Sequence, residues 1–175
     1  MKTATIRRIA AELRERYGDT SDPDRLCRET GVLALFSPMG DFPGACKGFI
    51  VSCFGHSAIT VNSDLDDAMA RVIFFHELSH FFLHISGTQG ETFQDFSVFD
   101  RTSDMEYEAN LLAAELMLTD EAVYDVLNGG ADFYEAAAVL KVPPEILDFK
   151  LRLMRSDGIG IPEAPIAADS CFLGR

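Results

Sequence analysis

The chain contains no tryptophan, and it has only four histidines and four cysteines among 175 residues. The cysteines are Cys27, Cys46, Cys53 and Cys171, and no two of them form a C-x-x-C pair. Their spacing therefore predicts neither a zinc ribbon nor a thioredoxin-like redox motif. At this density we expect free thiols in a reducing compartment rather than a disulfide framework.

Basic residues and long apolar runs are also scarce. Lys and Arg number 15 against 28 Asp and Glu, which gives a formal net charge of −13. Nucleic-acid affinity depends on cationic side chains that neutralise phosphates, so we expect no direct nucleic-acid partner. The negative charge does not exclude a basic protein as a binding partner. The N-terminus has no apolar h-region, and His76, Glu77 and His80 interrupt the longest apolar run. We therefore expect no signal peptide and no membrane span, and a cytoplasmic protein.

The apolar fraction, 47%, is ample for one core, and we expect an α+β, mostly helical fold with a small β-sheet. Apolar periodicity and turn residues predict strands at 32–36, 47–54 and 58–62, and helices at 6–17, 23–30, 64–85, 104–117, 120–127, 131–140 and from 144 onward. A single domain over 1–157, with a helical closing segment at 131–157, is expected to precede an extended tail at 158–175.

Two helix starts carry a capping-box pattern, in which Ser is followed three residues later by an acidic residue. Ser63 with Asp66 precedes the helix predicted at 64–85, and Ser103 with Glu106 precedes the next helix. The intervening loop, 86–103, has no clear periodicity, and we expect it to shape a substrate cleft beside the first of these helices.

Three of the four histidines fall within nine residues, and two of them belong to the pentapeptide His76-Glu77-Leu78-Ser79-His80. Residues i and i+4 of a helix lie about 40° apart around the axis, so both imidazoles can reach one zinc ion. Glu77 can then act as general base on the water that the zinc activates. The alternative is a pair of core histidines, but a core helix rarely buries two histidines beside a carboxylate.

A catalytic zinc requires a third protein ligand. His84 lies one further turn along, but ligands at i, i+4 and i+8 are nearly collinear, so we expect it to have a structural or supporting role. Glu106, Glu108 and Glu115 are available on the next helix. Glu106 fits the capping role, and we prefer Glu108. The oxyanion-stabilising group stays open among Tyr107, His56 and His84.

Two segments resemble the ImmA/IrrE metallopeptidase family. Residues 76–84 resemble its H-E-L-G-H-x-x-L-H signature, and residues 106–118 resemble its E-x-E-A-N-x-F-A-A-E-L-L-M-P block. The helix pair at 136–153 is similar to the closing segment of the family, so the resemblance spans roughly residues 45–155. Departures include Ser79 in place of Gly and Leu112 in place of Phe.

The resemblance implies a thermolysin-like minimal zinc fold, with His76, His80 and Glu108 as zinc ligands and Glu77 as the catalytic base. It also implies a site-specific intracellular endopeptidase that cleaves a helix-turn-helix repressor and so relieves repression. An extended substrate is expected to pair with the strand at 47–54 or with that at 58–62.

Two other classes of function are weighed against the peptidase. Residues 131–155 could form a DNA-binding helix-turn-helix, but the acidic chain opposes this. A structural zinc site could instead support a partner-binding module, such as half of a toxin–antitoxin pair. Glu77 favours the peptidase, because a structural zinc site has no need of a base.

Overall fold

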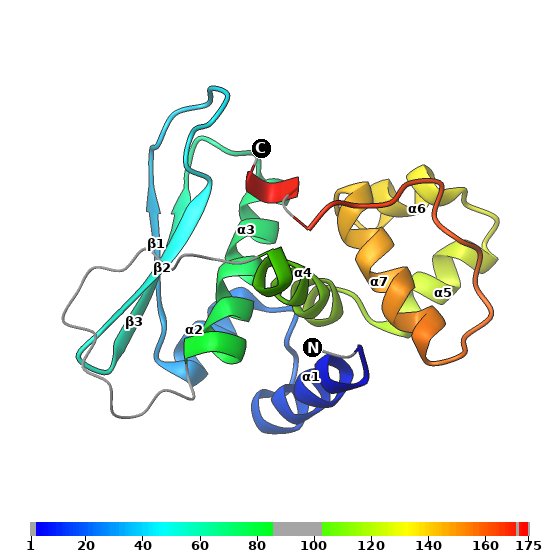
Figure 1. Ribbon diagram of the computed structural model, residues 1–175, viewed down its shortest axis with the longest axis horizontal. Coiled ribbons are helices and arrows are strands. Elements are labelled where there is room, and N and C mark those ends of the chain that lie inside the picture. The colour runs from blue at the N-terminus through cyan, green and yellow to red at the C-terminus, as the bar shows by residue number, and fades with distance from the viewer. Residues whose placement is uncertain (1–2, 86–102, 171, 175) are drawn as a thin grey trace.

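The computed structural model describes residues 3–85, 103–170 and 172–174. Two helices, α3 (Asp67–His80) and α4 (Ser103–Met117), lie at the centre, with a small sheet on one side and the C-terminal helices on the other (Figure 1). This arrangement confirms the α+β, mostly helical class. Most of the loop expected at 86–103, and Cys171, lie outside the described residues.

The first two helices, α1 (Thr3–Tyr17) and α2 (Pro23–Thr30), occupy the positions that the sequence predicts. The Asp22 side chain accepts a hydrogen bond from the Arg25 backbone N–H at 3.1 Å, and Pro23 occupies the first turn of α2. Gly31 ends α2 with a φ of 72°, which favours glycine because the left-handed region is strained for other residues.

The sheet has three strands in the order β1-β3-β2: β1 (Leu33–Ser37), β2 (Gly48–Cys53) and β3 (His56–Asn62). β1 pairs with β3 in parallel, and β2 pairs with β3 antiparallel. Phe54 and Gly55 form a two-residue turn with φ of 51° and 79°, so β3 begins two residues earlier than expected. β3 is paired on both sides, so the expectation that the strand at 58–62 pairs with a substrate is wrong. β2 lies at an edge of this sheet, so the alternative, pairing with the strand at 47–54, stays a prediction.

The sheet lies directly against α3, as the sequence predicts. Ile50, Ile59 and Val61 on its inner face are buried. The backbone of Gly48 approaches α3 so closely that an added Cβ would collide with Ile73 Cγ2. A larger residue at Gly48 would therefore force either the Ile73 side chain or the backbone of the sheet to shift.

The start of α3 differs from the predicted one. The Asp66 side chain accepts from the Met69 N–H at 2.8 Å and is the N-cap, so the expected capping box of Ser63 is wrong. The Ser63 N–H instead donates to Ser37 O at 3.0 Å, which joins the segment before α3 to the end of β1. At its other end α3 continues into a π-helical turn, Phe81–Ile85.

The C-terminal helices are α5 (Asp120–Asn128), α6 (Phe133–Val139) and α7 (Pro144–Ser156), close to their expected ranges. Thr119 caps α5, and Asp132 with Glu135 forms a capping box at α6. The remaining chain runs back along α7 to a 3₁₀ turn, Phe172–Gly174, beside the central helices (Figure 1).

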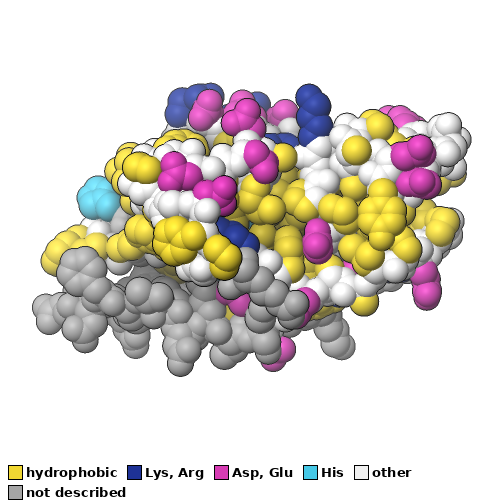
Figure 2. Space-filling view, turned by 90° about the horizontal axis from the view of Figure 1, so that it is seen from above, with side chains coloured by type: hydrophobic (Ala, Val, Ile, Leu, Met, Phe, Trp, Pro, Cys, Tyr) yellow, Lys and Arg dark blue, Asp and Glu magenta, His cyan; other side chains and the backbone are white. Residues whose placement is uncertain are grey.

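The surface is acidic in character, and acidic side chains are spread over the face seen from above (Figure 2). Large apolar side chains of the sheet are also exposed, among them Leu33, Leu35, Phe49 and Val51. None of the helices in the described residues has the length and apolar character to cross a membrane.

The cysteines within the described residues are free thiols, which agrees with the expectation from their spacing. Cys27 is half-buried, and Cys46 and Cys53 are exposed. Burial raises the pKa of the Cys27 thiol above its ordinary value, and the nearby Asp24 carboxylate raises it further. Cys27 is therefore a poorly reactive thiol at neutral pH.

Candidate metal centre

α3 presents His76 and His80 on one face, as the i, i+4 spacing predicts. Both side chains are buried, and their Nε2 atoms lie 3.1 Å apart. The small residue between them, Ser79, is fully buried and donates to Phe75 O at 2.7 Å.

A carboxylate from α4 completes the cluster. Glu106 Oε2 lies 3.1 Å from His76 Nε2, and Glu106 Oε1 lies 3.3 Å from His80 Nε2. The three candidate ligand atoms all lie within 4.8 Å of one another. We call His76, His80 and Glu106 the histidine–carboxylate group.

The geometry corrects the sequence-based choice of the third ligand, because Glu108 is not a member of this group. Residues two apart on a helix point about 200° from one another, so Glu106 and Glu108 cannot both face α3. Glu106 was expected to cap α4, but its carboxylate lies against the histidines instead. The third candidate, Glu115, is held by Lys150 at 2.7 Å and by Arg14 at 2.9 Å.

The histidines control the charge of Glu106. Burial alone would raise the pKa of this carboxyl, but without a metal ion the hydrogen bonds that protonated His76 and His80 donate through Nε2, together with the positive charge of their rings, lower it far below its ordinary range. Glu106 is therefore ionised at neutral pH, which is the state in which a carboxylate binds a metal.

Asn110, which the sequence analysis did not single out, fixes the orientation of His76. Its Nδ2 donates to Ser170 O at 2.7 Å, so its Oδ1 faces His76 Nδ1 at 2.9 Å. Since an amide oxygen can only accept, Nδ1 carries a proton, and in the neutral ring Nε2 therefore presents its lone pair to the group. Asn110 follows Glu106 by four residues, and this spacing was the available signal.

The donor set fits a tetrahedral metal ion. Two ligands each about 2.1 Å from a tetrahedral ion lie about 3.4 Å apart. The two histidine nitrogens are 3.1 Å apart, and each lies 3.1 Å to 3.3 Å from one of the two Glu106 oxygens, which is close to that value. Two imidazole nitrogens and one carboxylate supply three ligands and leave one position for a reactant.

Glu77 follows His76 directly and is buried next to the group. His84 lies in the π-helical turn with its ring centroid 5.3 Å from that of His80, and it is not a member of the group. Tyr107 packs against Phe149 of α7, with ring centroids 5.7 Å apart. His56, at the start of β3, is exposed. Of the three residues considered for the oxyanion, His84 is the one whose ring contacts the histidine pair.

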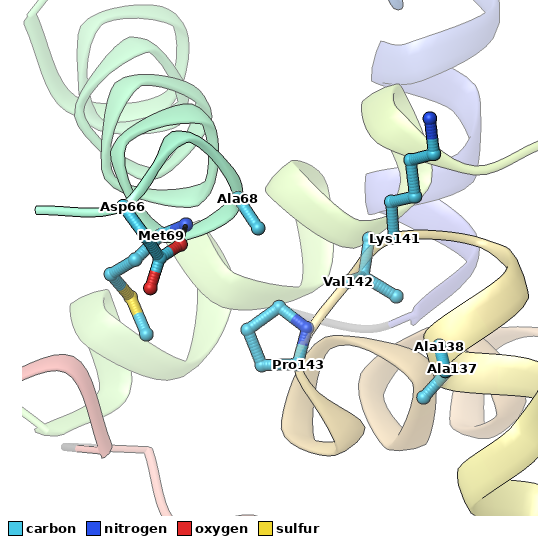
Figure 3. Close-up of a pocket in the computed structure, with 8 residues that line it drawn as sticks. All are labelled: Asp66, Ala68, Met69, Ala137, Ala138, Lys141, Val142 and Pro143. Carbon is cyan, nitrogen blue, oxygen red and sulfur yellow. Dashed lines mark hydrogen bonds between the residues drawn. The ribbon is translucent and has the colours of Figure 1, made fainter.

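A surface hollow of about 290 Å³ lies at the opposite end of α3 (Figure 3). It is lined by Asp66, Ala68, Met69, Ala137, Ala138, Lys141, Val142 and Pro143. At about 1.5 Å per residue, Asp66 is roughly 20 Å along the helix from His80. The hollow is therefore separate from the histidine–carboxylate group.

The family model Peptidase_M78, described as the IrrE N-terminal-like domain, matches residues 27–152. This range contains α3 and α4, and with them the whole histidine–carboxylate group. A search of curated proteins finds no significant match.

Proposed function

Since the chain belongs to the Peptidase_M78 family of metallopeptidases, we propose that it is a zinc-dependent endopeptidase of the cytoplasm. The observation that carries the proposal is the histidine–carboxylate group with Glu77 buried beside it. A group that only held a structural metal would not need an adjacent buried carboxylate in addition to its ligands.

We assign the metal ligands to His76, His80 and Glu106. A set of two imidazoles and one carboxylate, with one open position, suits a catalytic zinc. When bound, zinc acts as a Lewis acid that polarises a peptide carbonyl and lowers the pKa of water toward neutrality.

The protein itself supplies the proton transfers. Glu77, one residue from a ligand, accepts a proton from the attacking water as general base. It then delivers that proton to the nitrogen of the departing amine as the peptide bond breaks. Asn110 keeps His76 in the tautomer whose Nε2 can hold the metal throughout.

The substrate that we propose is a helix-turn-helix repressor, cleaved at a specific site so that repression is relieved. Such a partner has a basic DNA-binding face, and the net charge of −13 on this chain attracts it by charge complementarity. An extended segment of the repressor would add to the edge of β2, whose Phe49 and Val51 are exposed.

The DNA-binding alternative requires α7 to present its cations to phosphates. Lys150 is fully buried and pairs with Glu115 at 2.7 Å, and Arg152 pairs with Asp148 at 2.5 Å. These side chains are engaged inside the molecule, so the structure favours the peptidase over a DNA-binding function.

The test is a cleavage assay with purified, zinc-loaded protein. The substrates are any helix-turn-helix repressor whose gene adjoins that of this protein, an unrelated repressor and casein, and the controls are chelated protein and Glu77→Gln. We expect cleavage of the neighbouring repressor at one site, little digestion of casein, and no cleavage in either control. Rapid digestion of casein would contradict the proposed specificity, and cleavage by Glu77→Gln at the wild-type rate would remove Glu77 from the mechanism.

A further inference from the structure

The C-terminal strap, residues 159–170, runs along α7 and ends at the metal centre. It is attached at its near end by Arg155 Nη1, which donates to Pro162 O at 3.0 Å. Further along, Ala168 is fixed in both directions: its N–H donates to Asp148 Oδ2 at 2.9 Å, and its carbonyl accepts from Arg152 Nη2 at 3.0 Å. Beyond the strap, Phe172 stacks on the buried Phe149 with ring centroids 5.9 Å apart.

The carbonyl of Ser170 accepts the Asn110 amide hydrogen bond. We propose that this carbonyl is a positioning group of the metal centre: by orienting Asn110 it sets the tautomer of His76, and docking of the strap thereby controls metal affinity. This inference rests on the metal site of the proposed function and extends it to the tail.

The argument depends on the symmetry of an asparagine amide. Rotation by 180° exchanges the oxygen and the NH₂ group, which have nearly the same shape. In the flipped state the NH₂ group would donate to His76 Nδ1, the ring proton would move to Nε2, and Nε2 could not bind a metal. Ser170 O rejects the flipped state, because it would then face the amide oxygen instead of a donor.

An aspartate at position 110 would not depend on the strap in this way. Both of its oxygens accept, so either one would keep the proton on Nδ1 of His76. It would at the same time lose the donor to Ser170 O and repel that carbonyl. Asn110→Asp therefore separates the orientation of His76 from attachment of the strap.

The strap has its own anchors on α7, so its docking does not depend on Asn110 alone. Asp148 is buried and holds the backbone of Ala168, and Phe149 is fully buried beneath Phe172. Docking of the strap and binding of the metal are then linked, and each must strengthen the other by the same factor.

The experiment measures zinc affinity in the full-length protein by competition with a chromophoric chelator. We expect Asn110→Ala to weaken zinc binding about 10- to 100-fold, the range for loss of a group that orients a ligand. Phe172→Ala, which loosens the end of the strap, should weaken it by a smaller factor. Arg155→Gln, which removes the near-end contact with Pro162 and a 4.0 Å ion pair with Asp148, is the comparison variant and should weaken zinc binding less than Phe172→Ala does.

The decisive comparison is Phe172→Ala in the Asn110→Asp background, where we expect no further loss of affinity. Nitrogen NMR of metal-free protein at pH 8 is read in a Glu106→Ala background, which removes the carboxylate that faces Nε2 of His76 at 3.1 Å. It should show the proton of His76 on Nδ1, and a mixture of tautomers when Phe172→Ala is added. The proposal is overturned if Phe172→Ala leaves both zinc affinity and the tautomer unchanged, or if its effect persists with Asp at position 110. Because the tautomer is read without metal, a failure of zinc binding itself would be distinguishable.

Discussion

Helix α4 carries two carboxylates that face the interior, half-buried Glu106 near its start and fully buried Glu115 near its end, and they lie in opposite kinds of environment. Glu115 is surrounded by cations of the chain: Lys150 at 2.7 Å, Arg14 at 2.9 Å and Arg7 at 3.1 Å. Glu106 faces the nitrogens of two imidazoles, at 3.1 Å and 3.3 Å. The positive charge that balances Glu115 comes from Lys and Arg side chains of the protein itself. Glu106 instead lies beside two imidazole nitrogens, a set of groups that suits a bound metal cation.

We call the cluster around Glu115 the ion network; its members are Arg7, Arg14, Glu115, Asp120 and Lys150. It joins α1, α4, α5 and α7, so it fixes the C-terminal helices to the centre of the molecule. The comparison teaches that buried charge alone does not identify a site. The two clusters differ in the partners of their carboxylate: Glu115 pairs with Lys and Arg side chains, whereas Glu106 and two histidine nitrogens point to one place where a metal ion could bind.

The comparison first predicts that the chemistry depends on the histidine–carboxylate group and on Glu77 of α3, and not on the Glu115 end of α4. Glu77→Gln keeps the shape of the side chain but cannot accept a proton from water. We expect the cleavage rate to fall about 10²- to 10⁴-fold with zinc content and thermal unfolding unchanged. A parallel loss of zinc would show that Glu77 supports the metal rather than the proton transfer.

Stability, by contrast, should depend on the ion network. Among the described residues, Glu115→Ala leaves buried Lys150 with Asp120, at 2.6 Å, as its remaining acidic partner. We expect the free energy of unfolding of metal-free protein to fall by about 3 kcal/mol, the lower end of the range for a broken buried pair. The control is Glu12→Ala, which removes an exposed pair with Arg8 and should cost less than about 1 kcal/mol. Equal effects in urea unfolding would contradict the distinction.

Zinc should stabilise the protein through the histidine–carboxylate group alone. At free zinc 100-fold above the dissociation constant, we expect about 2.7 kcal/mol of added stability. His80→Ala should abolish this gain while leaving the ion network intact. Thermal unfolding with and without chelator measures the effect. A gain that persists in His80→Ala would place the metal elsewhere.

The smallest expected effect is the acid sensitivity of the ion network. Burial would raise the pKa of Asp120, but hydrogen bonds from Arg7 and Lys150 outweigh it and lower the pKa below its ordinary value of 3.8. A lowered carboxyl pKa contributes stability above pH 4 that is lost as the pH falls through the folded-state value. Asp120 is 39% exposed, so we expect less than about 1 kcal/mol.

Urea unfolding of wild type and Asp120→Asn at pH 7, 4 and 3 measures this difference. The gap between the two proteins should shrink on acidification. A gap that stays constant from pH 7 to pH 3 would show that Asp120 acts through packing and not through its charge.

Local sequence patterns predicted the parts of the molecule that local chemistry determines. The i, i+4 spacing of His76 and His80 and the capping of α2 by Asp22 and Gly31 depend on neighbouring residues only. The start of α3 was missed, because Ser63 and Asp66 both suit an N-cap and the partner of Ser63, Ser37, is distant in the chain.

Hydrophobic periodicity could not choose the third ligand, because α4 has no solvent-facing stripe over most of its length. All residues from 109 to 117 are buried, so hydrophobic periodicity does not indicate which face meets α3. The polar residue within that run that faces α3 is Asn110, four residues after Glu106. The sequence pattern that identifies the face of α4 toward α3 is a pair of polar residues at i and i+4. This pair, Glu106 and Asn110, lies opposite the i, i+4 pair of histidines on α3.

The central claim is that His76, His80 and Glu106 hold one metal ion. Its most direct test is zinc stoichiometry and affinity, measured by chelator competition, in Glu106→Ala, Glu108→Ala and Glu115→Ala compared with wild type. We predict one zinc per wild-type chain, at least about 100-fold weaker binding in Glu106→Ala, and near wild-type affinity in the other two once each is shown to be folded. Retained affinity in Glu106→Ala together with loss in Glu108→Ala would contradict the account.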